Sequence, residues 1–409
     1  MSGVQLGDAE WREAEGLKRI VAALRDEHGG PRIVGGAVRD SLLRLPVSDI
    51  DLATTLIPEA VVDRLEAARI KAIPTGIDHG TVTAVTDGKN YEITTLRRDV
   101  ATDGRRATVE FATDWREDAS RRDFTINALY ADPVTGEIFD YFGGLADLDA
   151  GIVRFIGDPD QRIAEDYLRI LRYFRFLARY GHGAVDAEAV AACARGVHGL
   201  TALSRERIAQ ELTKLLSSPD PSRPISLMVG NGIFSTFLPE VNAEAALILT
   251  AHVKREAEFA QPASLPARLL TLLPKDVDTV DRVAARLKLS NRMREALALR
   301  VSAPPPDESN IRALAYRCGV ECARDVAMLY ADGSHLAGCM KKLTDWDIPL
   351  FGIKGGDLIA LGLPAGPLVA KTLQAVEAIW IDEDFPPEIR QVAIARASVA
   401  EALSAARNA

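Results

Sequence analysis

The stretch "RIVGGAVRDSLLRLPVSDIDLATT", residues 32–55, predicts a strand, a glycine turn, a short helix and a second strand. Asp49 and Asp51 stand one residue apart in that second strand. Because side chains at i and i+2 of a strand point to the same face, we expect these two carboxylates side by side, with Ile50 and Leu52 turned toward a core. Adjacent carboxylates repel each other unless a cation lies between them. The spacing therefore predicts a site for a hard cation such as Mg²⁺.

The glycine turn upstream of the aspartates predicts a site for phosphate groups. Gly35 and Gly36 allow the backbone to approach a phosphate closely, and the N-terminus of the following helix adds a positive dipole. Arg39 adds a guanidinium that can donate two parallel hydrogen bonds. A lone Asp-x-Asp or Gly-Gly pair is common in proteins, whereas the two together, in this order and within about twenty residues, are far more specific. We therefore expect a triphosphate on the turn, bridged by magnesium to the aspartates.

A further carboxylate is a candidate for the same site. Glu92 lies in "YEITTLR", the second arm of a hairpin predicted from two alternating runs joined by Asp87-Gly88. It can act as a third catalytic carboxylate in a two-metal arrangement, or it can be a solvated strand residue. The sequence leaves open which of these holds and whether Glu92 binds metal.

Length, charge and hydropathy narrow the class of protein. The 409 residues suggest several domains. The net charge of −9 argues weakly against a nucleic-acid partner, but residues 161–180 hold five arginines against two acids, so this segment is locally basic. The N-terminus is polar, and no apolar run approaches the roughly 18 residues needed to cross a bilayer. These features predict a cytoplasmic protein that does not enter a membrane.

Hydrophobic periodicity divides the chain into a mixed α+β part and a long helical part. The first part alternates short strands and helices, including a helix predicted at "RRDFTINAL" and followed by a hairpin. From residue 161 onward almost every segment has helical periodicity. Residues 302–310, "SAPPPDESN", predict an exposed linker. We expect an α+β head over residues 1–157, a helical neck over 158–218, a helical body over 219–301 and a helical tail over 310–409.

Four motifs together resemble a known family. "GGAVRD" with "DIDLATT", then "RRDFTINAL", "DYFGGLADL" and "EDYLRILRYFRF", occur in the order typical of class II tRNA nucleotidyltransferases (CCA-adding enzymes) and their bacterial poly(A) polymerase relatives. The resemblance implies a mixed-sheet head of the DNA polymerase beta superfamily type, followed by an all-α neck, body and tail that hold tRNA. It also implies template-independent addition of C, C and A to the tRNA 3′ end from CTP and ATP, with Mg²⁺ as cofactor and pyrophosphate as product.

The resemblance assigns roles to individual residues. Asp49 and Asp51 are implied to bind metal, and Gly36 and Arg39 to contact the triphosphate. Asp123 is implied to lie near the ribose. The implied nucleotide-binding residues of "RRDFTIN" and "EDYLRILR" are Arg122, Asp123, Asn127, Asp166, Arg169 and Arg172.

The segment "EDYLR" predicts how a protein could select C and A. Asp166 and Arg169 are three residues apart, so on a helix they share a face. A carboxylate only accepts hydrogen bonds and a guanidinium only donates them, so the pair complements the edges of cytosine and adenine but not those of uracil and guanine. Glu165, four residues before Arg169, is expected to orient it. The alternative is an Asp166–Arg169 salt bridge on a solvated helix face.

The implied reaction is an in-line attack of the tRNA 3′-hydroxyl on the α-phosphate, with magnesium at Asp49 and Asp51 lowering the pKa of that hydroxyl and a second magnesium stabilising pyrophosphate. The polar segment Val100–Arg106 is expected to be a loop that moves between C and A addition. Deleting it should spare C addition and abolish A addition.

Three alternatives stay open at this point. A poly(A) polymerase would use ATP only, but the basic "GRRF"-like segment of that branch is missing from "RIKAIPTGIDHGTVTAV". An enzyme that adds only CC is expected to have altered the segment Val100–Arg106, which is charged here. A non-catalytic RNA-binding protein with a decayed head is disfavoured by the intact Asp49, Asp51 and Arg39. The sequence fixes neither the oligomeric state nor the RNA contacts of the tail.

Overall fold

The computed structural model describes residues 5–7, 9–27, 29–76, 80–103 and 106–408. The chain forms two compact units, Met1–Ala246 and Leu247–Ala409. The boundary between them falls inside the predicted body, so the division into head, neck, body and tail stays a prediction.

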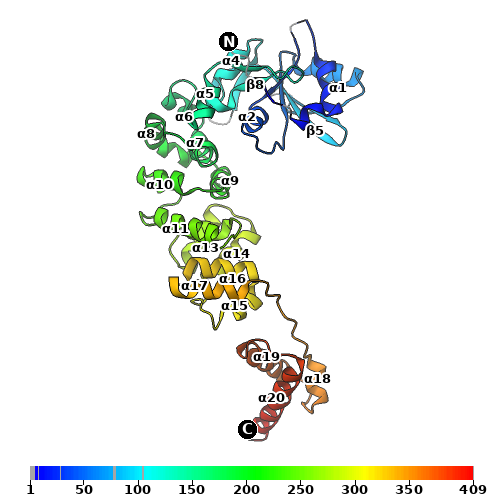
Figure 1. Ribbon diagram of the computed structural model, residues 1–409, viewed down its shortest axis with the longest axis vertical. Coiled ribbons are helices and arrows are strands. Elements are labelled where there is room, and N and C mark those ends of the chain that lie inside the picture. The colour runs from blue at the N-terminus through cyan, green and yellow to red at the C-terminus, as the bar shows by residue number, and fades with distance from the viewer. Residues whose placement is uncertain (1–4, 8, 28, 77–79, 104–105, 409) are drawn as a thin grey trace. The chain divides into compact units, whose positions relative to one another are not determined.

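The first unit is built on a seven-stranded mixed sheet with the strand order β3-β4-β5-β2-β1-β8-β9 (Figure 1). Strands β2 and β5 are parallel, and the other neighbouring strands are antiparallel. The predicted mixed-sheet head followed by helices is confirmed. The strands are β1 (Arg32–Val34), β2 (Asp51–Thr54), β3 (Lys71–Gly76), β4 (Thr81–Thr86), β5 (Lys89–Thr95), β8 (Leu129–Ala131) and β9 (Ile138–Asp140).

Helices interleave with these strands and pack against the sheet. The α2 helix starts directly at the glycine turn, and buried residues of β1, β2 and β8 share one apolar cluster that includes Val34, Ala53 and Tyr130. The helices and 3₁₀ turns of this part are η1 (Glu10–Glu13), α1 (Glu15–Leu24), α2 (Gly36–Leu42), α3 (Pro58–Ala67), α4 (Trp115–Ser120), η3 (Thr125–Asn127) and α5 (Gly144–Ala150).

The predicted hairpin around Asp87-Gly88 is present and fixes the register of Glu92. Asp87 and Gly88 have φ angles of 52° and 72°, as a tight hairpin turn of the I′ type requires at both central positions. Strand β5 pairs antiparallel with β4 on one side and parallel with β2 on the other. In the pairing with β2, Glu92 is the register partner of Asp51. The turn therefore brings a third carboxylate next to the aspartates.

The segment Val100–Arg106, predicted as a loop, lies mostly in a two-stranded antiparallel sheet. Strands β6 (Arg97–Asp103) and β7 (Arg106–Phe111) form this hairpin, and residues 104–105 at its tip lie outside the described residues. The β-branched residues Val100, Thr102, Thr108 and Val109 favour strand pairing despite the polar composition. The loop prediction was wrong for the described part of this segment.

The motif "RRDFTINAL" was expected to be helical and is not. Helix α4 ends before it, and only one 3₁₀ turn, η3, precedes strand β8. The backbone amide of Thr125 donates to the Arg154 carbonyl (3.0 Å), and its hydroxyl donates to Asp147 Oδ2 (2.7 Å). Because these partners lie far along the chain, the helical periodicity of the motif is overridden by tertiary contacts.

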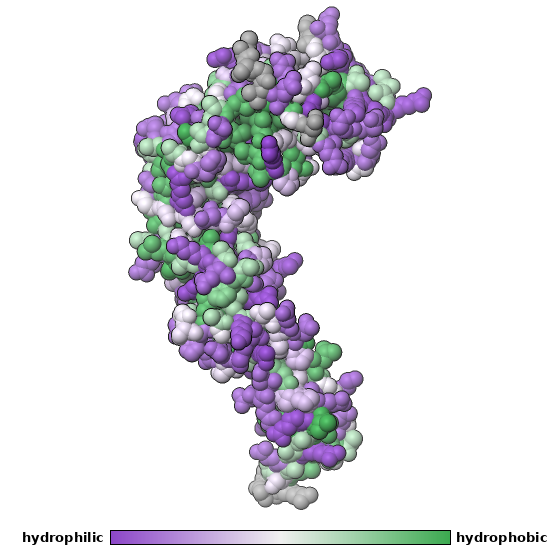
Figure 2. All heavy atoms as spheres, viewed as in Figure 1, coloured by the Kyte–Doolittle hydropathy of each residue, from purple (hydrophilic) through white to green (hydrophobic). Residues whose placement is uncertain are grey.

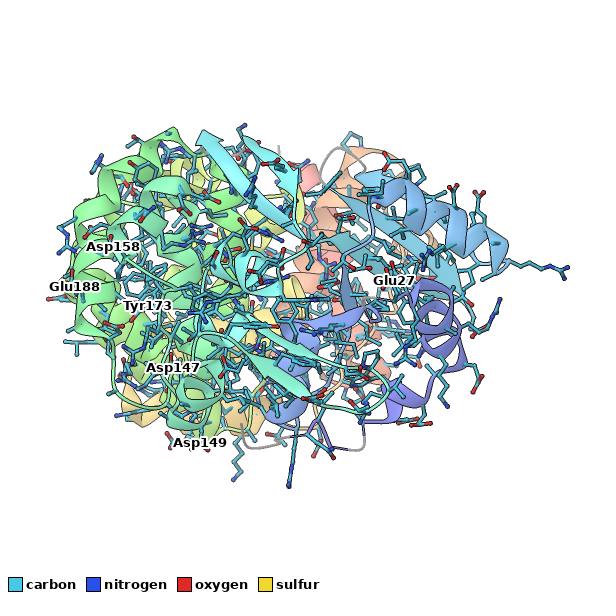
Figure 3. All side chains as sticks on the ribbon, turned by 90° about the horizontal axis from the view of Figure 1, so that it is seen from above. Glu27, Asp147, Asp149, Asp158, Tyr173 and Glu188 are labelled. Atoms are coloured by element: carbon cyan, nitrogen blue, oxygen red, sulfur yellow. The ribbon has the colours of Figure 1, made fainter. Side chains whose placement is uncertain are left out.

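Helices alone follow from residue 159 to the end of the first unit. Asp158 caps the first of them by accepting a hydrogen bond from the Gln161 amide (2.8 Å), and Figure 3 labels it among these helices. Helix α7 packs against α9 and α10. The elements are α6 (Pro159–Glu165), α7 (Leu168–Tyr180), α8 (Ala187–Gly196), η4 (Val197–Ala202), α9 (Arg205–Leu216), α10 (Ser222–Gly230) and η5 (Ile233–Thr236).

The second unit is helical throughout its described residues. Two apolar clusters organise it, one around Ile311 and Val326 and one around Val376 and Trp380. The helices are α11 (Ala245–Glu258), which begins at the boundary between the units, α12 (Leu265–Leu270), α13 (Val277–Arg286), α14 (Asn291–Val301), α15 (Ile311–Cys318), α16 (Val320–Tyr330), α17 (Gly333–Leu343), α18 (Gly355–Ala360), α19 (Pro367–Asp382) and α20 (Glu388–Asn408).

Hydropathy on the surface shown in Figure 2 is mixed, with hydrophilic and hydrophobic residues interspersed. Among the described residues, we found no helix with the length and apolarity required to cross a bilayer.

Buried ion pairs support the second unit, which gives a stability prediction. Arg300 Nε donates to Asp325 Oδ2 at 2.7 Å, and both residues are buried. Asp325→Ala leaves the Arg300 charge buried without this partner, and we expect the free energy of unfolding to fall by about 3–5 kcal/mol in urea denaturation. Asp281→Ala removes a partner of Arg294 from an exposed pair and should cost about 1 kcal/mol or less. Equal losses of unfolding free energy in the two variants would contradict the conclusion that the buried Arg300–Asp325 pair supports the second unit.

Candidate active site

A cavity of about 520 Å³ opens in the first unit, between the sheet and the helices that follow it in sequence. Most residues that the sequence singled out line it, although they come from segments far apart in the chain. Three predicted residues do not line the cavity but lie next to residues that do: Asp49, Glu92 and Glu165. The predicted residues in the lining are Gly35, Gly36, Arg39, Asp51, Arg122, Asp123, Asn127, Asp166, Arg169 and Arg172.

The glycine turn forms one wall of the cavity. Gly35 has φ 67°, a backbone conformation that L side chains rarely adopt, and it immediately precedes α2. A Cβ at this position would also lie 3.5 Å from the Asn127 carbonyl oxygen and 3.7 Å from Arg122 Nη1. The turn therefore needs glycine at position 35, and Gly35 and Gly36 line the cavity together with Arg122.

Acidic side chains gather at the neighbouring edge of the sheet. Asp51 begins β2 and pairs in register with Glu92 of β5. Asp49 precedes the strand instead of lying within it, yet exposure still alternates along this segment, with Asp49 and Asp51 exposed around a buried Ile50. Although Asp51 stays accessible through the cavity, desolvation by the surrounding protein raises the pKa of its carboxyl, and the nearby Glu92 and Asp49 raise it further against the opposing Arg122. The negative charges of these acids are therefore not fully neutralised by nearby positive side chains.

These acids fit a divalent cation that is shared with a ligand. Among the described residues, no group of three or more His, Cys, Asp or Glu side chains forms a ready-made metal cluster. Carboxylate oxygens of Asp51 and its neighbours are nevertheless the hard donors that Mg²⁺ prefers, and Mg²⁺ commonly binds through one or two carboxylates with substrate phosphates and water completing its octahedron. The donor set therefore suits magnesium bound together with a phosphate.

Arg39 is held at the back of the glycine turn. Its Nε donates to Asp40 Oδ1 at 2.8 Å, and its Nη1 donates to Asn127 Oδ1. Its Nη2 lies 3.7 Å from the position that a Cβ on Gly36 would take. One edge of this buried guanidinium therefore faces the turn.

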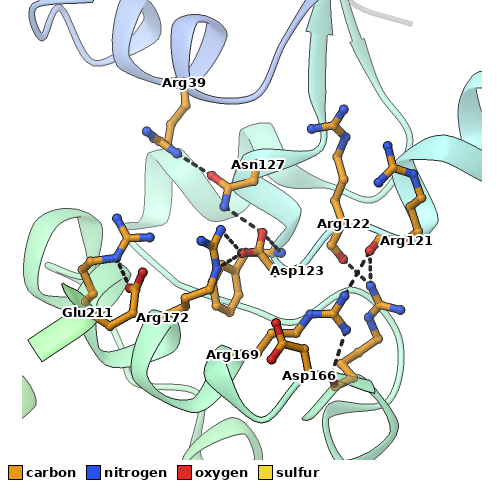
Figure 4. A network of polar contacts seen from close by, with 12 residues as sticks. Arg39, Arg121, Arg122, Asp123, Asn127, Asp166, Arg169, Arg172 and Glu211 are labelled. Carbon is orange, nitrogen blue, oxygen red and sulfur yellow. Dashed lines mark hydrogen bonds and ion pairs between the residues drawn. The ribbon is translucent and has the colours of Figure 1, made fainter. Parts of the chain in front are cut away.

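Asp123 is the centre of a polar network on the floor of the cavity (Figure 4). Its Oδ2 accepts hydrogen bonds from Arg172 Nε (2.8 Å) and Nη2 (2.6 Å), and its Oδ1 accepts from Asn127 Nδ2 (2.8 Å) and the Phe124 amide (2.9 Å). Burial by itself would raise the pKa of this carboxyl, but Arg172 and Asn127 outweigh burial and lower it. Asp123 is therefore an ionised acid that fixes its neighbours.

Arg122 is supported from behind by a buried acid and a tyrosine. Its Nη2 donates to Asp118 Oδ2 (3.2 Å) and its Nε to the Tyr130 hydroxyl (3.2 Å), while that hydroxyl donates to the same Asp118 oxygen (2.6 Å). Its Nη1 points toward Gly35, as described above. Two guanidiniums, those of Arg39 and Arg122, thus converge on the glycine turn.

Asp166 and Arg169 do not lie on one helix, contrary to the expectation from "EDYLR". Helix α6 ends at Glu165, Asp166 has extended backbone angles, and α7 begins at Leu168. The Asp166 side chain instead accepts from the amide of Leu168 (3.1 Å), the first residue of α7. The predicted shared helix face was wrong, although both side chains line the cavity.

Each of these two residues is bound to a different partner. Arg207 Nη2 of α9 donates to Asp166 Oδ2 at 2.9 Å, and Arg169 Nη1 donates to Glu165 Oε2 and to the Arg162 carbonyl (2.8 Å). The expected contact between Glu165 and Arg169 is present. The alternative of an Asp166–Arg169 salt bridge is not among the ion pairs of the described residues. Both side chains are therefore oriented without neutralising each other.

Residues of this site that the sequence motifs do not predict include Arg207, Phe176 and Arg162. Phe176 lines the cavity, while Arg162 Nη2 donates to the carbonyls of Arg121 and Arg122. The spacing of Phe176 from Arg169 and Arg172 on one helix was a usable signal, whereas Arg207 reaches the cavity only through the packing of α9 on α7.

Two family models match the chain. One describes the poly A polymerase head domain and matches residues 31–154. The other describes a probable RNA and SrmB-binding site of polymerase A and matches residues 184–244. The first match includes the strands that carry Asp51 and Glu92, and the second includes helix α9, which carries Arg207.

Relatives extend the similarity over most of the chain. The mitochondrial CCA tRNA nucleotidyltransferase 1 of Mus musculus is 37% identical over 382 residues, which cover 90% of this chain and 86% of the relative. The CCA-adding enzyme of Geobacillus sp. (strain WCH70) is 31% identical and is covered to 90%. A solved structure of the Bacillus stearothermophilus CCA-adding enzyme in complex with CTP has a TM-score of 0.74 at 28% identity, covering 97% of this chain and 98% of that one.

The network around Asp123 predicts a pH-dependent stability. Because the folded-state pKa of Asp123 lies below its ordinary value near 3.9, its contribution is present above about pH 4 and is lost as the pH falls further. Asp123→Asn should lower the free energy of unfolding at pH 7 by about 2–3 kcal/mol, and the difference from wild type should shrink toward pH 3. Urea denaturation across this range measures both. Asp281→Asn, in an exposed pair with Arg294, serves as the control. A difference that is constant with pH would refute the prediction.

Proposed function

We infer that the chain, which belongs to the family of CCA-adding tRNA nucleotidyltransferases, adds C, C and A to the 3′ end of tRNA from CTP and ATP. The observation that carries this conclusion is the arrangement of one cavity. Acids and a glycine turn with two guanidiniums lie at one end, and Asp166 and Arg169 with separate partners lie at the other. A nucleoside triphosphate needs one surface that binds its phosphates and another that binds its base.

At the phosphate end we assign roles to the predicted residues. Gly35, Gly36 and Arg39 hold the β and γ phosphates, with Arg122 on the opposite side of the turn. Nucleotidyltransferases of this kind are typically metal-dependent, and we assign the metal to Asp49 and Asp51. When bound there, Mg²⁺ supplies charge neutralisation at the phosphates and lowers the pKa of the attacking hydroxyl.

The third acid, Glu92, is assigned to the same catalytic group because it pairs in register with Asp51. The chain's own contribution to the reaction is positioning, since the guanidiniums and the turn hold the β and γ phosphates and so place the α-phosphate in line with the tRNA 3′-hydroxyl. The proposed reaction does not require a dedicated general base.

At the base end, the hydrogen-bonding capacity of Asp166 and Arg169 supports selection of C and A. An ionised carboxylate has about four acceptor positions, and Asp166 uses two of them for Arg207 and the Leu168 amide. A guanidinium has five donors, and Arg169 directs its bonds to Glu165 and to the Arg162 and Arg121 carbonyls. Capacity therefore remains for a base that donates to Asp166 and accepts from Arg169, as cytosine and adenine do.

Asp123, Asn127 and Arg172 are assigned to the floor of the nucleotide site. Because Asp123 already accepts four hydrogen bonds from the protein, we propose that it acts near the ribose chiefly by holding Arg172 and Asn127 in place. The cytoplasm is proposed as the compartment, although the mouse relative is named as a mitochondrial protein.

A tRNA transcript that ends before CCA tests the activity directly. With Mg²⁺ and CTP alone we expect two added residues, with CTP and ATP three, and with ATP alone none. Asp51→Asn should reduce addition at least 10³-fold, since it removes a negative oxygen from the acidic cluster. Separation of products at single-nucleotide resolution measures this. Long A tails from ATP alone would instead favour a poly(A) polymerase, addition that stops after CC would favour the partial enzyme, and no addition at all would favour a binding protein.

Arg207 gives a prediction about base selection. Arg207→Met removes the bond that orients Asp166, and we expect the ratio of kcat/KM for CTP to that for UTP to fall about tenfold, the equivalent of one charge-assisted hydrogen bond. Single-turnover C and U incorporation on the same tRNA measures the ratio. Arg195→Met removes an arginine from an exposed surface pair and should leave the ratio unchanged. An unchanged ratio in Arg207→Met would show that Asp166 is oriented without Arg207.

A further inference from the structure

One face of helix α7 carries four residues spaced three or four apart: Arg169, Arg172, Phe176 and Tyr180. The first three line the cavity. Tyr180 ends the helix, is buried with 6% of its surface exposed, and lies behind the cavity wall. The roles assigned above make no use of this tyrosine.

Tyr180 contacts Arg39 in two ways. Its hydroxyl donates to Asp40 Oδ1 at 2.9 Å, the same oxygen that accepts from Arg39 Nε at 2.8 Å. Its ring also lies under the Arg39 guanidinium, with 4.2 Å from the guanidinium carbon to the ring centroid. The tyrosine therefore holds the arginine directly through a cation–π contact and indirectly through the shared carboxylate.

These contacts decide which edge of Arg39 is available to a ligand. Nε is bonded to Asp40 and Nη1 to Asn127, whereas Nη2 faces Gly36 and has no hydrogen-bond partner within the part of the chain that the structure describes. The other Asp40 oxygen lies 3.6 Å from Arg179, whose side chain is half exposed. Loss of the Tyr180 hydroxyl leaves Asp40 free to turn toward Arg179, and Arg39 then loses one of the two hydrogen bonds that fix its direction.

We propose that Tyr180 is a positioning residue for triphosphate binding, which acts from the helix that also carries Arg169 by directing Arg39 Nη2 at the glycine turn. The proposal rests on the role assigned to Arg39 under the proposed function. It adds that the phosphate end of the cavity is set by the same helix whose first turn contributes to base selection.

Tyr180→Phe tests the proposal because it removes the hydroxyl and keeps the ring. We expect the Kd for CTP and for ATP, and the corresponding KM, to rise about three- to tenfold, the effect of one buried hydrogen bond. The kcat and the KM for tRNA should stay within about twofold of wild type. Tyr180→Leu, which also removes the ring, should raise the nucleotide KM further. Calorimetric titration with CTP and steady-state C addition on tRNA lacking CCA measure these quantities on the full chain.

Two comparisons separate positioning from packing. Tyr173 lies on the same helix, does not line the cavity, and donates its hydroxyl to the Asp186 carbonyl (3.4 Å), so Tyr173→Phe should leave the nucleotide KM unchanged. In the Asp40→Asn background, Tyr180→Phe should add little, because the tyrosine hydroxyl acts through that carboxylate.

Three results would overturn the proposal: an unchanged Kd for CTP in Tyr180→Phe, an equal rise in the KM for tRNA, or an effect that adds fully to that of Asp40→Asn. A wild-type chain that adds no nucleotide to tRNA would instead refute the proposed function, and the CTP titration would still decide the role of Tyr180.

Discussion

The buried carboxylate of Asp123 is the interaction on which the geometry of the cavity depends. It accepts from Arg172 on α7 and from Asn127 of η3, and Asn127 accepts in turn from Arg39 on α2. An ionised carboxylate that is buried without partners costs several kcal/mol, so these elements must stay where they can supply donors. One acid thereby fixes the helix that follows the glycine turn and the helix that carries Arg169.

The cavity resolves an apparent conflict between the charge of the chain and its partner. A protein of net charge −9 is a poor candidate for binding polyphosphate or RNA when judged by charge alone. Its cavity nevertheless contains several guanidiniums, and acids bind them from behind: Asp118 holds Arg122, and Glu165 holds Arg169. These acids reduce the repulsion among the guanidiniums and fix their directions while leaving donors exposed. Acidic residues therefore fix the guanidiniums to which we assign nucleotide binding, and the net charge of the chain does not reveal this arrangement.

The parts of the fold and site that could be predicted are those set by local chemistry. A tight turn at Asp87-Gly88 and strand alternation were enough to predict the hairpin that carries Glu92, and the Gly-Gly pair predicted the turn with positive φ. The parallel pairing that places Glu92 opposite Asp51 joins segments some forty residues apart and has no local signal. The hydroxyl of Thr125 likewise finds its partner in a later helix, which is why a helical pattern there gave a wrong prediction.

The break between α6 and α7 shows why local periodicity was insufficient and what the break achieves. The segment around Asp166 has continuous helical periodicity, but Arg207 binds the carboxylate from a helix about forty residues later, and no pattern within the segment contains that contact. Had the helix continued, Asp166 and Arg169 would share a face and could neutralise each other, and a base would have to compete with that ion pair. With the helix interrupted, each side chain is oriented by a third residue and keeps bonding capacity toward the cavity. A protein can then offer a fixed acceptor beside a fixed donor, which is the pattern that a nucleic-acid template would otherwise supply.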